Sequence, residues 1–440
     1  MTIPNPVPEP VDLDRTLGDA TGIMIPAHGE ALREDGAPWL TAAFRRFGSL
    51  PADNAVERIV RLERCAGGST GAKFLLDVEY ARPGPDLRTA LFVKFSRDFT
   101  DRRRDHPGRY EMASEVPFMA LARQPGFPVD VAEPYFADYE QATGTGIVIT
   151  ERIAFGAEAG GRRIEPHRPK TLDFETLADP LPYYRATVTA LARLAAAHKA
   201  GRLSSDIETL FPWNPATGSA DPIRQTAAEL EAELSSCRAF VERAPQHFPE
   251  RVRSAEFMAR FRREALQVRE NERAIQAFLT GNSDMIALNH WNAHIDNAFF
   301  WREGEALHCG LIDWGRVGQI TLGAALWGGL SAAHHDIWDR HLDDLLGLFV
   351  EEYRSGGGPA VTAAALEQHL MMHIAAMGVA RVLAFPEIIE FRLPGVFDAS
   401  GPQDPEVLAV EPGRNCLHVL TVFLKLWEAR DLGGRARRLS

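Results

Sequence analysis

The chain has 440 residues, of which 45% are hydrophobic and 25% are charged, a composition typical of globular proteins with a buried core. This length is sufficient for two or three compact units. The formal net charge of -12 argues against a polyanionic partner, so we expect no nucleic acid to bind. The spacing of the cysteines argues against a disulfide framework or a zinc site, and is consistent with a reducing, cytoplasmic location. The cysteines are Cys65, Cys237, Cys309 and Cys416.

The first 33 residues are predicted to form a flexible arm, because prolines at alternate positions interrupt regular structure. These prolines are Pro4, Pro6, Pro8 and Pro10. No apolar core follows a basic start, so we expect no signal peptide. No apolar run approaches 18 residues, so we also expect no membrane partner.

Residues 34–154 are predicted to form a small lobe that consists of a sheet and a helix. Alternating apolar residues between glycine and proline turns indicate strands, and a longer amphipathic run indicates the helix. A lead-in helix is expected at 38–47, strands at 56–64, 74–80, 90–95, 134–139 and 146–151, and a helix at 109–123. The first half therefore predicts five strands.

Residues 155–440 are predicted to form a larger, mainly helical lobe. Residues 155–182 carry glycine, proline and arginine and indicate an irregular connector. Helical periodicity then predicts helices at 184–199, 226–240 and 255–279. A short hairpin is expected at 299–311, and helices return from residue 320. The predicted fold class is therefore α+β, with a five-stranded antiparallel sheet before a helical part.

A glycine-rich turn lies between the first two predicted strands. Its candidate ligand-binding residues are Gly67, Gly68, Ser69 and Gly71. Glycines let backbone N–H groups approach an anion closely, and such a turn can hold phosphate oxygens. The same pattern also occurs in ordinary hairpin turns.

Lys94 lies near the end of the apolar strand 90–95. A lysine at this position can reach phosphate groups if a carboxylate holds its ammonium group. The next helix offers Glu111 and Glu115. We prefer Glu115, because Met112, Val116 and Met119 flank it at core-facing spacing.

Two short segments follow in the second half, at 289–297 and 312–315. The second contains Asp313 at the end of an apolar strand, followed by tryptophan and a permissive glycine. Carboxylate and amide oxygens are suitable Mg²⁺ ligands, and magnesium usually keeps several waters. We therefore expect Asp313 and Asn297 to form a Mg²⁺ site.

Together these segments resemble the phosphate-transferring proteins of the aminoglycoside phosphotransferase and choline kinase superfamily. Residues 290–297 follow the frame H-x-D-x-x-x-x-N of a catalytic loop, and residues 313–315 follow the metal-binding D-F-G turn. The resemblance covers about residues 35–430. It implies a bilobal protein-kinase-like fold that binds ATP and Mg²⁺, with the hinge near Glu151.

Within this superfamily the chain is most similar to the ecdysteroid-kinase-like branch. Glu115 is followed three residues later by Phe118, as in that branch. A proline-aromatic strand at 134–136 and a glycine turn before the strand 146–151 also match. The resemblance implies that Lys94, Glu115 and Glu151 belong to the nucleotide site.

The sequence departs from the family pattern at residue 292. The frame requires an aspartate that accepts the proton of the substrate hydroxyl, but this chain has Asn292. Asparagine can orient a hydroxyl by hydrogen bonding, although it is a poor base. His290 begins the frame, and Asp296 is either a displaced base or a brace for the loop. These three residues are the candidate catalytic group.

Three functions are compatible with these patterns. The preferred one is an ATP- and Mg²⁺-dependent phosphotransferase that acts on a hydroxyl group of a small molecule. The second is a pseudokinase-like protein that binds nucleotide without useful catalysis. The third is a different transfer on the same scaffold, such as nucleotidyl transfer. The identity of the acceptor and the oligomeric state stay open at this point.

Overall fold

The computed structural model describes residues 13–66, 70–101, 105 and 108–439. The chain divides by its internal packing into two compact units. Unit 1 comprises Met1–Glu165 and Gly310–Val317, and unit 2 comprises Pro166–Cys309 and Gly318–Ser440. The predicted metal turn at 312–315 therefore packs with unit 1, although the sequence places it in the helical lobe. The reason is that the turn is anchored on a helix of unit 1, as shown below.

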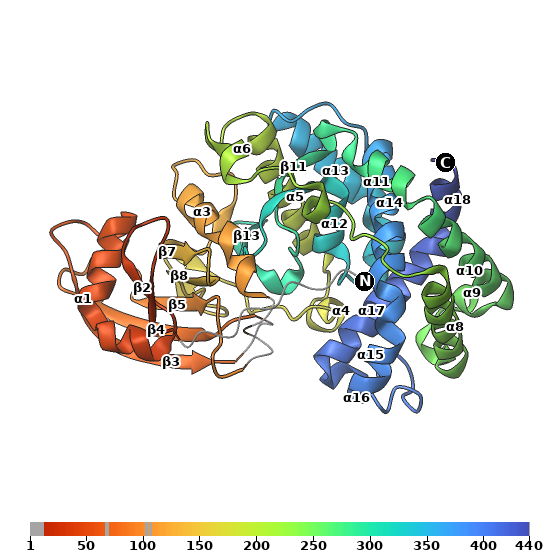
Figure 1. The fold of residues 1–440 in the computed structure, drawn as a ribbon, viewed down its shortest axis with the longest axis horizontal. Coiled ribbons are helices and arrows are strands. Elements are labelled where there is room, and N and C mark those ends of the chain that lie inside the picture. Colours follow the sequence, from red (N-terminus) through yellow and green to blue (C-terminus); the bar gives the residue numbers. More distant parts are fainter. Residues whose placement is uncertain (1–12, 67–69, 102–104, 106–107, 440) are drawn as a thin grey trace. The chain divides into compact units, whose positions relative to one another are not determined.

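Unit 1 is built on a five-stranded antiparallel sheet with the strand order β3-β4-β5-β8-β7 (Figure 1). Strand β5 is central, paired with β4 and β8 on its two sides. The sheet strands are β3 Val56–Cys65, β4 Lys73–Tyr80, β5 Ala90–Phe95, β7 Pro134–Glu140 and β8 Thr145–Glu151. The other elements are β1 Arg15–Leu17, β2 Met24–Pro26, α1 Gly29–Phe47, η1 Gly108–Glu111, α3 Met112–Ala122, β6 Asp130–Val131, β9 Glu158–Ala159 and β10 Arg162–Arg163.

The predicted flexible arm at 1–33 is wrong for residues 13–33. Strands β1 and β2 pair antiparallel, and Ile25 and Leu32 are fully buried in the core of the sheet. The Asp138 carboxylate of β7 also accepts hydrogen bonds from the backbone N–H groups of Ala20 and Thr21, at 3.0 Å each. Burial of apolar groups and pairing of buried polar groups hold this segment in place. Residues 1–12 lie outside the described residues.

Helix α1 begins earlier than the predicted start at Pro38. His28 caps it by accepting a hydrogen bond from the Ala31 N–H, and the helix breaks at Gly36, where φ is 62°. Proline disfavours helical geometry in the residues just before it, so the break precedes Pro38. The second part of α1 packs on the sheet, where Phe44 meets Tyr135 edge to face at 5.4 Å.

Unit 2 is mainly helical (Figure 1). Helix α5 is central to it, since it contacts α12, α13 and strand β11. Its elements up to the loop at 289–297 are α4 Asp173–Thr176, α5 Leu181–Lys199, α6 Ile207–Leu210, α7 Pro215–Gly218, α8 Ala227–Arg243, η2 Pro245–His247, α9 Glu250–Arg253, α10 Ala255–Glu270, α11 Glu272–Thr280, η3 Ser283–Met285 and β11 Ile286–Asn289.

The rest of the chain forms short strands and further helices. Those elements are η4 Ile295–Asn297, β12 Ala298–Glu303, β13 Ala306–Leu311, β14 Gly318–Thr321, α12 Leu322–Leu330, η5 Ile337–His341, α13 Leu342–Ser355, α14 Ala363–Arg381, η6 Val382–Ala384, α15 Phe385–Arg392, α16 Pro405–Ala409, α17 Glu411–Ala429 and α18 Leu432–Arg437. Strand β14 pairs antiparallel with β11, a pairing that the sequence did not predict. The predicted helix at 255–279 is two helices, because the chain turns at Asn271.

The predicted α+β class is confirmed, with an antiparallel five-stranded sheet followed by a mostly helical part. The sheet strands begin and end within two residues of their predicted positions. This agreement reflects strong local signals, namely alternation of apolar side chains between turns. Among the helices that the structure describes, none combines the length and the apolar character that a membrane crossing requires.

Candidate functional site

In unit 1 the side chains of Lys94, Glu115 and Asp313 meet. The Lys94 Nζ lies 2.9 Å from Glu115 Oε2 and 2.6 Å from Asp313 Oδ1. Lys94 lies on β5, the third strand of the sheet, and Glu115 lies on α3, the helix that follows that strand. A strand lysine held by a helix glutamate is the arrangement that positions nucleotide phosphates in protein kinases. Glu115, and not Glu111, is thus the partner of Lys94.

Burial and charge oppose each other at this cluster. Burial disfavours the Lys94 ammonium ion, but the charges of Asp313 and Glu115 outweigh it and hold the pKa of Lys94 above its ordinary value. Burial raises the pKa of Glu115; the Asp313 charge adds to this effect, and Lys94 opposes it. Lys94 therefore stays protonated, and its ammonium group pairs with both carboxylates.

The turn that carries Asp313 is anchored on helix α3. The Trp314 ring stacks on Phe118 with centroids 4.0 Å apart, and the Arg316 N–H donates a hydrogen bond to the Glu111 carbonyl at 2.9 Å. Asp313 itself has φ of 61°, an unusual conformation for a residue with a side chain. Its side chain is half exposed, so one face of the carboxylate is open to solvent.

Gly315 lies close to the Lys94 cluster. A Cβ atom there would lie 3.4 Å from the Lys94 Nζ and 3.8 Å from Glu115 Oε2. These are ordinary van der Waals distances, so an alanine would fit at this position, and the packing alone does not account for the glycine.

The glycine-rich turn is only partly described. Gly67, Gly68 and Ser69 lie outside the described residues. Gly71 has φ of 60°, and a Cβ there would lie 1.9 Å from the Phe95 carbonyl oxygen. The glycine at 71 is therefore explained by close packing of two strand ends, and its role in phosphate binding stays a prediction.

Glu151 ends strand β8, as predicted. Its Oε2 accepts a hydrogen bond from Arg88 Nε at 3.1 Å, and burial raises its pKa although Arg88 opposes the shift. The carboxylate thus already has a partner within unit 1. Its predicted contact with nucleotide stays a prediction.

In unit 2 the loop 289–297 is braced by its own polar side chains. Asn289 Nδ2 donates to the Leu191 carbonyl at 3.1 Å, and Asn289 Oδ1 accepts from the His290 N–H at 2.9 Å. His290 is buried, and its Nδ1 accepts from the Asn292 N–H at 3.0 Å. His290 therefore positions the backbone at residue 292.

Asn297 closes the loop. Its Nδ2 donates to the Asn292 carbonyl at 2.9 Å, which leaves its Oδ1 as an acceptor. Asn292 is half-buried, and its side chain forms no hydrogen bond with the described residues. The backbone of Asn292 is thus held by hydrogen bonds at its N–H group and at its carbonyl group. Its side-chain amide can offer a hydrogen bond to a ligand hydroxyl.

Asp296 is engaged by the connector that precedes α5. Lys170 Nζ lies 3.4 Å from Asp296 Oδ2, and His167 Nε2 lies 3.0 Å from the Asp296 carbonyl oxygen. The Asp296 Oδ1 is buried. These contacts are typical of a brace, whereas a base must reach the proton it removes.

The two proposed metal ligands belong to different units, Asn297 to unit 2 and Asp313 to unit 1. Their joint coordination of Mg²⁺ stays a prediction. The donor set fits the ion, because both residues offer a hard oxygen atom and Asp313 is partly open to solvent.

No protein-family model and no curated protein matches the sequence. Solved structures that are similar include a spectinomycin phosphotransferase, APH(9)-Ia, in complex with ADP and spectinomycin, at 11% identity and a TM-score of 0.39, covering 87% of this chain and 94% of that one. A microcompartment-associated aminopropanol kinase has 14% identity and a TM-score of 0.41, with 91% and 100% covered. A choline/ethanolamine kinase family protein from Mesorhizobium loti has 14% identity and a TM-score of 0.38, with 90% and 98% covered.

These neighbours are of the kinds that the sequence motifs resemble. With such low identities and TM-scores they carry no weight in the proposal below, which rests on the geometry within each unit. The narrower resemblance to the ecdysteroid-kinase-like branch stays a prediction.

Several residues of the site were not predicted from the sequence. Lys170 and His167 lie in a segment without periodicity, so no local pattern pointed to their contact with Asp296. The stacking of Trp314 on Phe118 had a partial signal, because Phe118 follows Glu115 by one helical turn.

Proposed function

We propose that this chain is an ATP- and Mg²⁺-dependent phosphotransferase that moves the γ-phosphoryl group to a hydroxyl group of a small molecule. The observation that carries the proposal is the buried Lys94 ammonium group held between Glu115 and Asp313. A buried cation with two carboxylates at 2.6–2.9 Å is costly to desolvate and has an evident use in holding phosphate oxygens.

Each unit contributes a separate part of this chemistry. In unit 1 Lys94 would bind phosphate oxygens, while Glu115 fixes the direction of the ammonium group. In unit 2 the amide of Asn292 would orient the acceptor hydroxyl. Asp313 and Asn297 would be the ligands of Mg²⁺, which would neutralise charge on the phosphate oxygens.

The absence of a carboxylate at 292 lowers the expected rate but leaves positioning intact. General-base catalysis contributes roughly 10²–10⁴-fold, whereas phosphoryl transfer depends mainly on positioning and charge stabilisation. Because Asp296 is engaged by Lys170, it is a poor substitute for the missing base. We therefore propose slow transfer.

Asn292 also supports a second candidate function, a catalytically impaired protein that binds nucleotide. The two candidates share the nucleotide site and differ only in product formation. Both require Lys94 and Asp313, so both predict weaker Mg-ATP binding in Lys94→Met and Asp313→Asn.

The test combines binding with product analysis. Mg-ATP affinity is measured by calorimetry, and high enzyme concentrations are then incubated with a panel of alcohols, amino alcohols and sugars. Mass spectrometry identifies the added group, since a phosphoryl and a nucleotidyl group differ in mass. Phosphorylated product that is lost in Asp313→Asn supports the phosphotransferase. Binding without product supports the second candidate, and absence of purine nucleotide binding at millimolar concentration contradicts both.

A further inference from the structure

Arg109 is a buried arginine in unit 1 that lies outside the Lys94 cluster. It belongs to η1, directly before helix α3, and only 5% of its surface is exposed. Its Nε is buried without a hydrogen-bond partner, and its Nη2 donates to the Tyr110 hydroxyl at 3.3 Å. Among the described residues no carboxylate forms an ion pair with this guanidinium group. A buried charge of this kind normally has an anionic partner.

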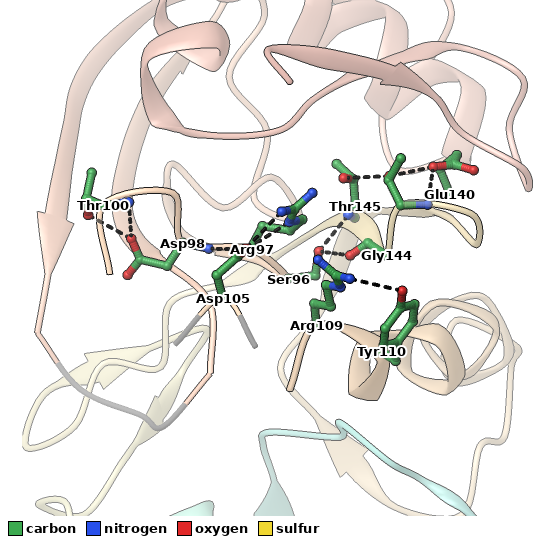
Figure 2. A network of polar contacts seen from close by, with 12 residues as sticks. Ser96, Arg97, Asp98, Thr100, Asp105, Arg109, Tyr110, Glu140, Gly144 and Thr145 are labelled. Carbon is green, nitrogen blue, oxygen red and sulfur yellow. Dashed lines mark hydrogen bonds and ion pairs between the residues drawn. The ribbon is translucent and has the colours of Figure 1, made fainter. Parts of the chain in front are cut away.

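Two nearby carboxylates are already engaged by other side chains, and Figure 2 shows the bonds of Asp105 to Arg97 and of Asp98 to Thr100. Arg97 binds Asp105 through two parallel hydrogen bonds of 2.8 Å, and Asp98 accepts from Arg64 and from Thr100. Burial opposes ionisation of Asp105, but the hydrogen bonds and charge of Arg97, with a smaller contribution from the charge of Arg109, outweigh it and lower the pKa of Asp105. Arg109 therefore shares the charge of Asp105 with Arg97, and Arg97 is the residue that bonds to both carboxylate oxygens.

Arg109 is held in a fixed position by close packing. A Cβ at Gly144 would lie 2.9 Å from Arg109 Cγ, so the arginine passes over a glycine of the turn between β7 and β8. A Cβ at the preceding Gly108 would lie 2.1 Å from the Thr70 side chain. Arg109 therefore lies next to the described end of the glycine-rich turn. A pre-organised guanidinium group loses little side-chain entropy when it binds.

The guanidinium group lies beside a partly exposed residue, Tyr110. Tyr110 is 41% exposed, and the Arg109 Cζ lies 5.0 Å from its ring centroid. The Tyr110 hydroxyl is a second potential donor to the same ligand.

We propose that Arg109 binds a phosphate group, with the Tyr110 hydroxyl as an additional donor. The guanidinium fork matches the oxygens of a tetrahedral anion and remains charged at any accessible pH. The ligand is either the phosphate chain of a nucleotide, which rests on the function proposed above, or a separate phosphate. Binding here would order the start of α3, the helix that carries Glu115, and would thereby position the partner of Lys94.

The test uses inorganic phosphate in the absence of any acceptor, so it is independent of catalysis. Thermal unfolding of the wild-type chain is followed in potassium phosphate and in potassium chloride of equal ionic strength. Phosphate is expected to raise the melting temperature of the wild type. In Arg109→Gln the phosphate affinity is expected to fall roughly tenfold or more, the usual loss for a charge-assisted hydrogen bond. Arg109→Lys is expected to retain part of it.

Arg82→Gln is the matched control, because it removes an exposed arginine of unit 1 that pairs with Asp53. It is expected to keep the response to phosphate. A phosphate effect that is absent in the wild type, or equal in Arg109→Gln, overturns the proposal.

Two further measurements distinguish a nucleotide phosphate from a separate phosphate and keep the test valid if the variant fails to fold. If the ligand is a nucleotide phosphate, ATP displaces inorganic phosphate and Arg109→Gln also weakens ATP binding; if it is separate, the two stabilising effects add. In the wild type, phosphate is expected to slow amide hydrogen exchange in residues 108–115. Unchanged exchange there contradicts the proposal even if the variant fails to fold.

Discussion

Lys94 and Asp313 are 219 positions apart in the chain, yet the Lys94 Nζ lies 2.6 Å from the Asp313 Oδ1. Both belong to unit 1, because the turn at 312–315 packs on helix α3. The carboxylate that we assign to Mg²⁺ is thus an ion-pair partner of the lysine that we assign to phosphate. If a Mg²⁺–nucleotide binds, we expect Lys94 to contact the phosphate oxygens and Asp313 to contact Mg²⁺, in place of their contact with each other.

Replacing Lys94 by methionine is expected to destabilise unit 1. The change leaves Glu115 buried beside Asp313 without their shared cation. Loss of one partner of a buried ion pair costs about 3–5 kcal/mol, and we expect about 2–4 kcal/mol here because Asp313 is half exposed. Urea unfolding measures this difference. Lys199→Met is the control and should cost much less, because within the described part of the chain the Lys199 ammonium group bonds only to the Ser283 carbonyl.

Replacing Asn292 by aspartate is expected to raise the rate of phosphoryl transfer. A carboxylate at this position can accept the proton of the hydroxyl, an effect of roughly 10²–10⁴-fold. The rate constant at saturating ATP is the measurement. The gain should disappear in the double variant with Asp313→Asn. An unchanged rate in Asn292→Asp would favour the nucleotide-binding protein without catalysis.

Two glycines of unit 2 are expected to respond oppositely to alanine. A Cβ at Gly328 of α12 would lie 1.9 Å from the Trp291 carbonyl, so Gly328→Ala should displace the loop 289–297 and cost about 1–3 kcal/mol. A Cβ at Gly347 of α13 would have no atom within 4 Å, so Gly347→Ala should stabilise the helix by about 0.5–1 kcal/mol. Melting temperatures of both variants test this pair. Equal shifts in the same direction would contradict the packing described.

His369 is expected to contribute to acid sensitivity. Burial lowers its pKa from 6.5 to about 4 in the folded chain. Between these pH values the unfolded chain binds a proton that the folded chain excludes, so stability falls as the pH decreases from 6.5 towards 4. The slope contributed by one histidine is at most about 1.4 kcal/mol per pH unit.

His369→Phe should therefore make the pH dependence of the unfolding free energy shallower in this range. Phenylalanine can keep the ring contact with Phe278, whose centroid is 4.5 Å away. His308→Phe is a suitable control, because His308 also contacts an aromatic ring, that of Trp301, but is partly exposed. The same slope in His369→Phe and in the wild type would show that the folded chain protonates His369 readily.

Replacing Asp138 by asparagine is expected to loosen the N-terminal segment. The buried carboxylate accepts hydrogen bonds from the Ala20, Thr21 and Tyr139 N–H groups, and an amide would turn a donor towards one of them. Loss of one or two of these charge-assisted bonds corresponds to about 2–4 kcal/mol. Limited proteolysis near residue 20 and urea unfolding measure the effect. Asp53→Asn, an exposed position, should change stability little.

Short-range patterns in the sequence were sufficient to locate most local elements and the candidate residues of the motifs. Apolar alternation located the five strands, and side-chain spacing on the predicted helix at 109–123 selected Glu115 over Glu111, because both signals act over a few neighbouring residues. Which groups meet was settled only by the packing of the folded chain. The contact of Asp313 with Lys94, the packing of residues 13–33, the brace on Asp296 and the burial of Arg109 depend on segments far apart in the chain. Burial and electrostatic pairing act through space, so no local pattern records them.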